Sequence, residues 1–288
     1  MSAQAALVAA TRALQAAGIE AAAGDARALM AAAMQVSRDR LTLHLGDDLD
    51  AAAAARFDAM IARRMAREPV AKIIGRREFW GRSFEVTADV LDPRPETECL
   101  IAEALRGPVP ARLLDLGTGS GIIAVTLLAE MPGARGVATD ISAAALEVAG
   151  RNAARHGVDT RLDLCRSDWF SQVTSEFDLI VSNPPYIAAD EMPDLSPEVR
   201  DHDPERALSD GGDGLSAYRM IAVGAGAHLR PGGRIALEIG WQQGAQVRDI
   251  LTRAGFAEVG VLPDLDGRDR VIVGVWTAKQ GGSVPSDR

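Results

Sequence analysis

One short segment has the residue types and spacing needed to hold a planar nitrogen group. The tetrapeptide Asn183-Pro184-Pro185-Tyr186 directly follows the apolar segment 177–182. An amide or ring-bound amino nitrogen is a poor nucleophile because its lone pair is delocalised, so its NH₂ group must be held in plane and in line with the reacting partner. Asn183 Oδ1 can accept one N–H and the Pro184 carbonyl the other, while the two prolines fix that carbonyl. Tyr186 offers a flat face, and an ordinary proline-rich turn would explain neither the Asn nor the Tyr.

A glycine-rich turn lies between the segment 112–116 and an apolar helical segment that begins at Ile122. Glycine tolerates unusual φ values and has no Cβ, so the backbone can approach a ligand, and the following helix offers free N–H groups. The spacing is Gly-x-Gly-x-Gly with Asp115 before it, which disfavours a dinucleotide site. The turn consists of Gly117, Thr118, Gly119, Ser120 and Gly121.

Three further residues could bind a nucleoside. Asp140 ends the segment 136–140, where a carboxylate can accept hydrogen bonds from both ribose hydroxyls; alternatively, it caps the next helix. Asp168 could accept a hydrogen bond from an adenine amino group, and Trp169 could pack on the ring or belong to the core. A nucleoside site beside a site for a planar NH₂ group indicates methyl transfer from S-adenosylmethionine. Displacement at a sulfonium needs an enclosed site, so we expect no metal.

The elements that must position these residues alternate between strand and helix from about residue 111. This pattern predicts an α/β domain with a mostly parallel sheet covered on both faces. Open sheets of this kind bind ligands at the carboxyl ends of their strands, so the three groups of residues should meet at one edge. The predicted strands are 112–116, 136–140, 160–165, 178–182, 234–239, 257–262 and 270–276.

The first 70 residues are rich in alanine and predict a small helical bundle. Asp25 is expected to be the N-cap of one helix, and another is expected to run from Asp50 toward Glu68 until Pro69 stops it. Because no catalytic cluster is visible there, we interpret the bundle as a docking or recognition module. The apolar positions expected to face its core are Leu7, Ala10, Leu14, Leu29, Met30, Ala33, Phe57, Met60, Ile61 and Met65.

The bundle should connect to the α/β domain through a hairpin. Bulky apolar residues, including Ile73 and Ile74, surround Gly81-Arg82 between residues 71 and 90, which predicts two short antiparallel strands. We therefore expect a helical recognition domain at 1–72, a β-hairpin linker at 73–92, a Rossmann-like domain at 93–279 and a disordered tail at 280–288.

The composition narrows the class of partner. The 288 residues carry a formal net charge of −9, which opposes general binding to phosphate backbones, so we expect no direct nucleic-acid contact. Cys99 and Cys165 show neither CxxC spacing nor nearby histidine, so neither a disulfide nor a zinc site is expected. No apolar run reaches the ~18 residues of a membrane span and no basic leader is present, so we expect a soluble, cytoplasmic protein without membrane contact.

Taken together, the motifs resemble those of the HemK/PrmC family of protein-(glutamine-N5) methyltransferases. The resemblance spans nearly the whole chain and rests on GRREFW at 75–80, PRPETE at 93–98, DLGTGSG at 115–121, Asp140 and the tetrapeptide at 183–186. It implies a Rossmann-like class I S-adenosylmethionine-dependent methyltransferase domain that modifies the glutamine of the Gly-Gly-Gln loop in peptide chain release factors. It also implies that the glycine turn, Asp140 and Trp169 bind the cofactor, and that the tetrapeptide binds the glutamine, with Asn183 also near the methyl donor. Asp203 stands where the family usually has Glu, which leaves the shape of that loop open.

The same motifs also fit three alternatives. The same tetrapeptide occurs in adenine-N6 methyltransferases of DNA or RNA, because an exocyclic amine poses the same geometric problem. A related enzyme methylates a glutamine of a ribosomal protein, although PRPETE and the helical bundle favour release factors. A protein that only binds the nucleoside would be expected to lose Asn183 or a proline, and this chain retains all four residues of the tetrapeptide.

Overall fold

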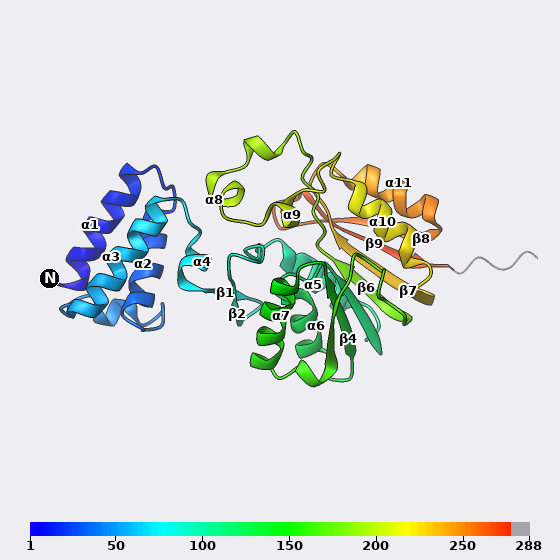
Figure 1. Ribbon diagram of the computed structural model, residues 1–288, viewed down its shortest axis with the longest axis horizontal. Helices are drawn as coiled ribbons and strands as arrows, with labels where there is room; N and C mark the ends of the chain where they lie inside the picture. Colours follow the sequence, from blue (N-terminus) through cyan, green and yellow to red (C-terminus); the bar gives the residue numbers. More distant parts are fainter. Residues whose placement is uncertain (278–288) are drawn as a thin grey trace, which may run out of the picture.

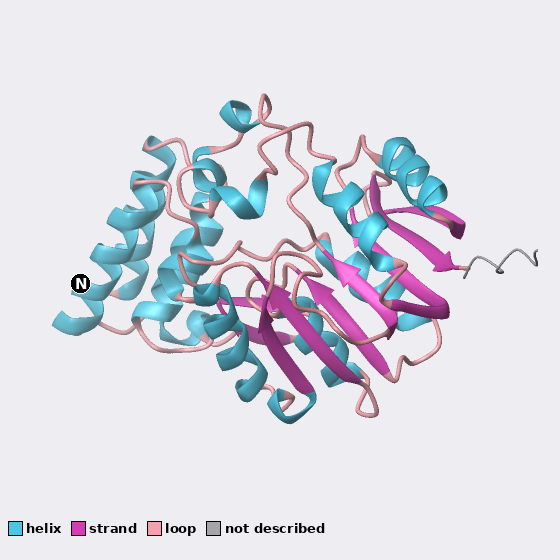
Figure 2. Ribbon diagram, turned by 45° about the vertical axis from the view of Figure 1, so that its right-hand side comes forward, coloured by secondary structure: helices cyan, strands magenta, loops and turns pink. Residues whose placement is uncertain are grey.

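A seven-stranded sheet forms the centre of the larger part of the protein. The computed structural model describes residues 1–277, so the predicted tail at 280–288 lies outside the described residues. The strand order is β5-β4-β3-β6-β7-β9-β8; the first five strands are parallel, and β9 is antiparallel to both of its neighbours (Figures 1 and 2). The strands are β3 (Arg112–Leu116), β4 (Arg135–Asp140), β5 (Leu162–Arg166), β6 (Phe177–Ser182), β7 (Leu229–Glu238), β8 (Phe256–Pro263) and β9 (Asp269–Trp276).

All seven predicted strands are confirmed, with β7 beginning five residues before the predicted start at 234. Its register against β6 shifts between Phe177 and Leu179, so the early part of β7 lies beside an irregularity that alternation of residue types does not reveal. Residues 159–161, of which 160 and 161 were assigned to a strand, instead form a short 3₁₀ turn, η2 (Asp159–Arg161), before β5.

Two layers of helices cover the sheet, each enclosing its own apolar core. One core is built from α5, α6, α7 and the facing strand residues, and the other from α10 and α11. In α6 every residue from Ile122 to Leu128 is buried, which explains why all of them except Thr126 are apolar. The helices are α5 (Thr97–Arg106), α6 (Ile122–Glu130), α7 (Ala143–Arg155), α10 (Ser216–Ala225) and α11 (Gly244–Ala254).

The N-terminal helices form a separate lobe with a third core (Figure 1). This core contains most of the positions predicted to face it. The helix expected to run from Asp50 is α3, and Asp50 caps it by accepting a hydrogen bond from the Ala53 N–H at 2.6 Å. The elements are α1 (Ala3–Ala16), α2 (Ala22–Ala33), the 3₁₀ helix η1 (Leu41–His44), α3 (Ala51–Met65) and α4 (Val70–Ile74).

Three predictions for this lobe were wrong. Asp25 is not an N-cap: α2 begins earlier, at Ala22, and the Asp25 carboxylate instead pairs with Arg64 Nε at 2.8 Å. Met65 does not face the core, because α3 turns the neighbouring Arg64 inward to meet that carboxylate and leaves Met65 44% exposed. Pro69 does not stop α3, which ends at Met65; it begins α4 instead.

The predicted hairpin is present but shorter than expected. It consists of β1 (Arg76–Phe79) and β2 (Arg82–Glu85), antiparallel to each other. Ile73 and Ile74 belong to α4, which ends at Gly75 in a left-handed conformation with φ of 80°. Their assignment to the hairpin was therefore wrong, because an apolar run this short does not distinguish a buried helical turn from a strand.

A long connection between β6 and α10, residues 187–215, reaches back to the helical lobe. It contains η3 (Met192–Asp194), α8 (Pro197–Arg200) and α9 (Glu205–Leu208). Glu198 accepts hydrogen bonds from Arg64 and Arg67 of the lobe.

Asp203, the residue at which the chain departs from the family pattern, is the centre of this junction. Its side chain is fully buried, with one carboxylate oxygen 2.7 Å from Lys72 Nζ and the other 2.8 Å from an Arg94 guanidinium nitrogen. The Asp92 N–H also donates to it, at 3.2 Å. Asp203 thus joins the lobe, the linker and the long connection.

Within the part of the chain that the structure describes, no helix is both long and apolar enough to cross a membrane.

Candidate active site

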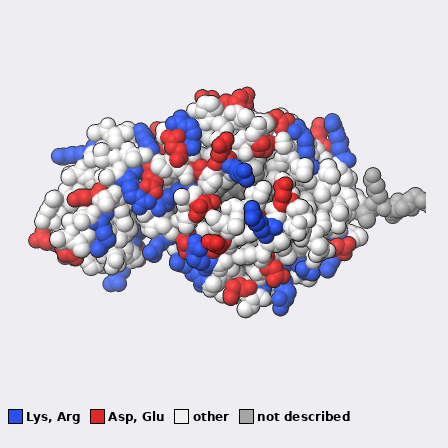
Figure 3. Space-filling model, in the orientation of Figure 1, with Lys and Arg blue, Asp and Glu red and all other residues white. Residues whose placement is uncertain are grey.

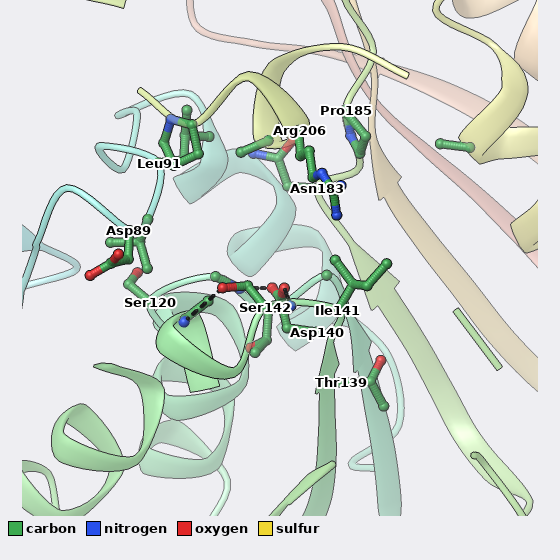
Figure 4. Close-up of a pocket in the computed structure, with 18 of the residues that line it drawn as sticks. Asp89, Leu91, Ser120, Thr139, Asp140, Ile141, Ser142, Asn183, Pro185 and Arg206 are labelled. Atoms are coloured by element: carbon green, nitrogen blue, oxygen red, sulfur yellow. Dashed lines mark hydrogen bonds between the residues drawn. The ribbon is translucent and has the colours of Figure 1, made fainter. Parts of the chain in front are cut away.

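A cavity of about 900 Å³ opens at the carboxyl ends of β3, β4, β5 and β6 (Figure 4). After β3 the chain builds the sheet outward through β4 and β5, and it then returns to add β6 on the other side of β3. Such a change of direction separates the loops at the strand ends and creates a crevice for ligands. The predicted site residues that line the cavity are Gly117, Thr118, Gly119, Ser120, Asp140, Asp168, Trp169, Asn183 and Pro185; Gly121, Pro184 and Tyr186 do not line it.

The glycines of the turn after β3 have two different roles. Gly117 and Gly119 have φ of 67° and 55°, and a Cβ added to either would meet no atom within 4 Å, so their backbone faces open space. Gly121 has φ of 80°, but a Cβ there would lie 3.0 Å from the Ala149 Cβ of α7. Gly121 therefore permits α6 and α7 to pack, whereas the other two leave room in the cavity.

Asp115 anchors this turn to the end of β3. It is fully buried at the end of β3 and accepts hydrogen bonds from Thr118 Oγ1 at 2.6 Å and from the Ala124 N–H at 3.2 Å. Burial raises the pKa of this carboxyl to about 7, against the opposing effect of these two hydrogen bonds. The contacts join the turn to the first residues of α6.

Asp140 lies on the cavity wall and braces two loops. Its carboxylate accepts hydrogen bonds from the Gly119 N–H and the Ser142 N–H, both at 2.9 Å (Figure 4). The N-cap of α7 is Ser142, whose hydroxyl accepts from the Ala145 N–H, so the alternative that Asp140 is the cap is wrong. Its remaining acceptor capacity is available to a ligand in the cavity.

Asp168 and Trp169 form the wall that follows β5. Asp168 is exposed, whereas Trp169 lines the cavity and also packs against the core enclosed by α10 and α11. Trp169 has φ of 48°, a left-handed conformation that is uncommon for a bulky residue. Ser167 stabilises it by donating a hydrogen bond to the Trp169 carbonyl at 2.8 Å. Trp169 can therefore pack against the core and contact a ligand at the same time.

The tetrapeptide at the end of β6 contributes unequally to the cavity. Asn183 and Pro185 line it, while Pro184 is buried. Tyr186 points its hydroxyl toward Glu238 Oε1, 3.5 Å away, and its carbonyl accepts a hydrogen bond from Gln243 Nε2 at 2.9 Å. Burial raises the pKa of the Tyr186 hydroxyl well above its ordinary value, so this group stays protonated and can donate.

Two residues behind the tetrapeptide, Thr97 and Glu238, were not predicted as site residues. Glu238 Oε2 lies 2.6 Å from Thr97 Oγ1, which lies 3.4 Å from Asn183 Nδ2. Burial raises the pKa of Glu238 to about 7 although the Thr97 hydrogen bond opposes this. The sequence does mark Glu238 as unusual, because it is a lone acid within the apolar segment 235–239. Its proximity to Asn183, however, depends on the order of the strands in the sheet.

Comparisons with known proteins agree with this geometry. Residues 5–75 match a family described as the PrmC N-terminal domain, and residues 95–215 match one described as the methyltransferase small domain. A release factor glutamine methyltransferase from Cereibacter sphaeroides is 62% identical over 94% of this chain and 98% of its own. Another, from Agrobacterium fabrum, is 44% identical over 92% and 94%. The chain belongs to the release factor glutamine methyltransferase family.

The fold agrees with this membership. A solved methyltransferase from Pyrococcus furiosus superposes with a TM-score of 0.54 at 18% identity, covering 77% of this chain and 98% of that one. At such low identity the similarity concerns the fold alone. It supports a Rossmann-like class I methyltransferase domain around the seven-stranded sheet.

This methyltransferase uses S-adenosylmethionine, and the cavity fits that cofactor. Its volume falls within the ~300–1,000 Å³ typical of small-molecule sites. The backbone at Gly117 and Gly119 leaves space where side chains would intrude, and Asp140 supplies a carboxylate for hydroxyl groups. When bound, the cofactor supplies an electrophilic methyl group on a sulfonium.

Proposed function

We propose that this protein methylates the side-chain amide nitrogen, N5, of the glutamine in the Gly-Gly-Gln loop of peptide chain release factors. The observation that carries the proposal is the position of Asn183 and Pro185 on the wall of the same cavity as the glycine turn and Asp140. An acceptor for a planar amide thus faces a site suited to the methyl donor. The names of the relatives support the same substrate.

The tetrapeptide would hold the amide during transfer. Asn183 Oδ1 accepts one N–H of the glutamine and the Pro184 carbonyl accepts the other, which keeps the NH₂ group in plane. Pro185 and Tyr186 shape the space for the planar group. The bound cofactor would supply the methyl group, and the amide nitrogen, held by Asn183 and Pro184, would give up one proton to solvent as it gains that group. Two glycines beside the target leave its backbone bare, so it can enter a narrow cavity.

The remaining predicted residues would hold the cofactor. Asp140 accepts hydrogen bonds from the ribose hydroxyls, and Asp168 and Trp169 bind the adenine by a hydrogen bond and by packing. The glycine turn approaches the methionine portion, with Thr118 and Ser120 beside it, Gly121 setting the start of α6 and Asn183 close to the transferred methyl group.

The N-terminal lobe would recognise the release factor, with domain boundaries at 1–72, 73–92 and 93–279. The lobe contributes no residue to the cavity. Among residues 1–277, no group of three or more His, Cys, Asp or Glu side chains is placed to bind a metal ion. A protein partner working in translation implies a cytoplasmic location.

An adenine-N6 activity on nucleic acid is the second candidate, and charge disfavours it. The net charge is −9, and the face shown in Figure 3 mixes acidic and basic side chains rather than presenting a basic stripe. A glutamine of a ribosomal protein would fit the same cavity, so an experiment must distinguish this substrate from a release factor.

The test is to incubate the protein with isotopically labelled S-adenosylmethionine and, in parallel, release factor, ribosomal proteins or adenine-containing DNA. We expect one labelled methyl group on the release factor peptide that contains Gly-Gly-Gln, located on the glutamine by fragmentation. A release factor with that glutamine changed to glutamate serves as the control and should stay unlabelled. Label confined to DNA or to a ribosomal protein would contradict the proposal.

A further inference from the structure

A single buried carboxylate contacts both ends of the tetrapeptide, directly or through one hydroxyl. In the pairing of β6 with β7, Ser182 lies opposite Leu237, so the next residues, Asn183 and Glu238, lie side by side at the strand ends. Glu238 is 1% exposed. Its Oε1 is 3.5 Å from the Tyr186 hydroxyl, and its Oε2 is 2.6 Å from Thr97 Oγ1.

The direction of these hydrogen bonds follows from proton counting. An ionised carboxylate can only accept, and a threonine hydroxyl has one proton to donate. Because Thr97 gives its proton to Glu238 at 2.6 Å, only oxygen lone pairs remain to face Asn183. Those lone pairs attract the amide Nδ2, 3.4 Å away, and repel Oδ1.

The opposite branch of the Asn183 carboxamide is then the acceptor. Asn183 lines the cavity, and none of residues 1–277 donates a hydrogen bond to its Oδ1. With the reverse orientation, Nδ2 would face the substrate NH₂ group and two donors would oppose each other. The carboxamide orientation therefore decides whether the substrate nitrogen is held.

We propose that Thr97 and Glu238 are positioning residues that fix the orientation of the Asn183 carboxamide, with Oδ1 toward the substrate amide. This inference rests on the proposed function, because it assumes that Asn183 accepts a hydrogen bond from the transferred nitrogen. Arg270, whose guanidinium donates to the adjacent Ile239 carbonyl at 3.3 Å, favours the ionised form of Glu238 because its positive charge lowers the pKa of that carboxyl. Thr97 acts through Asn183 and performs no chemistry of its own.

The decisive variant is Thr97→Val, which removes the hydroxyl while keeping the shape of the side chain. We expect single-turnover methylation of release factor at saturating cofactor to fall about 10-fold, the effect of losing one orienting hydrogen bond. Calorimetric affinity for S-adenosylmethionine should be unchanged. Thr97→Ser restores the hydroxyl and should return the rate to within about 2-fold of the unmodified protein.

A matched control is available in Thr126→Val. Thr126 is also fully buried, but it lies in α6 and its hydroxyl has no hydrogen-bond partner within residues 1–277. This variant should methylate release factor at the normal rate. Melting curves of all variants identify any loss that comes from unfolding.

A double-mutant cycle separates positioning from a general structural effect. If Thr97 acts through Asn183, then Thr97→Val should cause no further loss in a chain that already carries Asn183→Ala. Equal losses in both backgrounds, or a Thr97→Ser variant as slow as Thr97→Val in a folded protein, would overturn the inference. Failure of the unmodified protein to methylate glutamine would instead refute the proposed function, so the two failures are distinguishable.

Discussion

Two asparagines of this chain differ in how much of the side-chain amide bonds to the rest of the protein. Asn152 is fully buried in α7 and uses its whole amide: Oδ1 accepts from the Glu85 N–H at 2.7 Å, and Nδ2 donates to the Glu85 and Ser120 carbonyls. Asn183 makes one long hydrogen bond and otherwise faces the cavity. Removing each side chain should therefore affect different properties.

We predict that Asn183→Ala lowers single-turnover methylation by about 10² to 10³, because loss of a positioned acceptor in an enclosed site costs roughly 2–4 kcal/mol at the transition state. Its melting temperature should change little. Asn152→Ala should instead lower the free energy of unfolding by roughly 2–4 kcal/mol, since it leaves buried backbone groups unpaired. Rapid-quench kinetics and thermal melts of both variants test this contrast. An Asn183→Ala variant that turns over normally would exclude the side chain from the mechanism.

The titration of Glu238 predicts that stability and turnover respond to pH in opposite directions. Burial raises the pKa of this carboxyl from 4.5 to about 7, with Thr97, Arg270 and Tyr186 opposing the shift and Glu96 adding to it. Between those values the folded chain binds a proton that the unfolded chain lacks, so the free energy of unfolding falls as pH rises through about 7. The ionised form needed to orient Asn183 increases over the same range.

Comparison with Glu238→Gln isolates this group. Between pH 5 and pH 8 the unmodified protein should lose on the order of 3 kcal/mol of stability relative to the variant, at ~1.4 kcal/mol per pH unit. Asp115, whose pKa is also raised to about 7, is present in both chains and cancels. Turnover of the unmodified protein should rise through about pH 7, while that of the variant stays flat. Parallel pH profiles for the two chains in denaturant melts would contradict the assignment.

Site residues that lie within contiguous motifs could be predicted from sequence, whereas their supports could not. The glycine turn, Asp140 and Asn183 occur at recognisable spacings, and the structure brings them to one cavity. Glu238 lies far along the chain and reaches Asn183 only because β7 is placed beside β6. Thr97 belongs to the PRPETE motif, but the motif does not indicate which residue its hydroxyl contacts in the fold.

At the scale of elements, the turn before α6 depends on glycine for two separable reasons. We predict that Gly121→Ala lowers the free energy of unfolding by roughly 1–3 kcal/mol, because it combines a φ of 80° with a Cβ placed 3.0 Å from that of Ala149. Gly133→Ala, at a position with open space and no positive φ, should be neutral or slightly stabilising. Urea titrations of the two variants measure the difference. Equal changes in the free energy of unfolding in the two variants would show that the close packing of α6 on α7 does not account for the effect of Gly121→Ala.

The presence of strands was predicted better than the ends of helices. All seven expected strands are found in the sheet. The ends of the N-terminal helices were misplaced because Asp25 and Arg64 satisfy each other across two helices, a long-range pairing that outweighs local capping preference. The 3₁₀ turn before β5 and the bulge in β7 left no comparable signal.

At the scale of the whole molecule, the buried pair of Lys72 and Asp203 joins the helical lobe to the connection that follows β6. We predict that Lys72→Met lowers the free energy of unfolding by about 3 kcal/mol, because it leaves a fully buried carboxylate with Arg94 as its remaining cationic partner. The apparent KM for intact release factor should also rise if the junction orients the lobe toward its partner.

The exposed pair of Arg230 and Asp178 provides the control for that measurement. Arg230→Met removes a cation that is 44% exposed, and such surface pairs contribute about 0–1 kcal/mol. Guanidinium titrations of both variants therefore compare a buried with an exposed ion pair in one protein. Similar losses from the two substitutions would show that the junction contributes no more than an ordinary surface contact.

The same junction has a consequence for the order in which a newly made chain folds. Lys72 contacts the carbonyl of His202, 130 residues further along the chain. At ~5–20 residues per second, bacterial or eukaryotic synthesis needs roughly 6–26 s to span that interval. During this time the helical lobe has its own apolar core but no partner for Lys72, so we expect it to emerge from the ribosome as an independent unit. Docking of the lobe would then be among the last steps of maturation, after β6 and the Asn183 that follows it have been made.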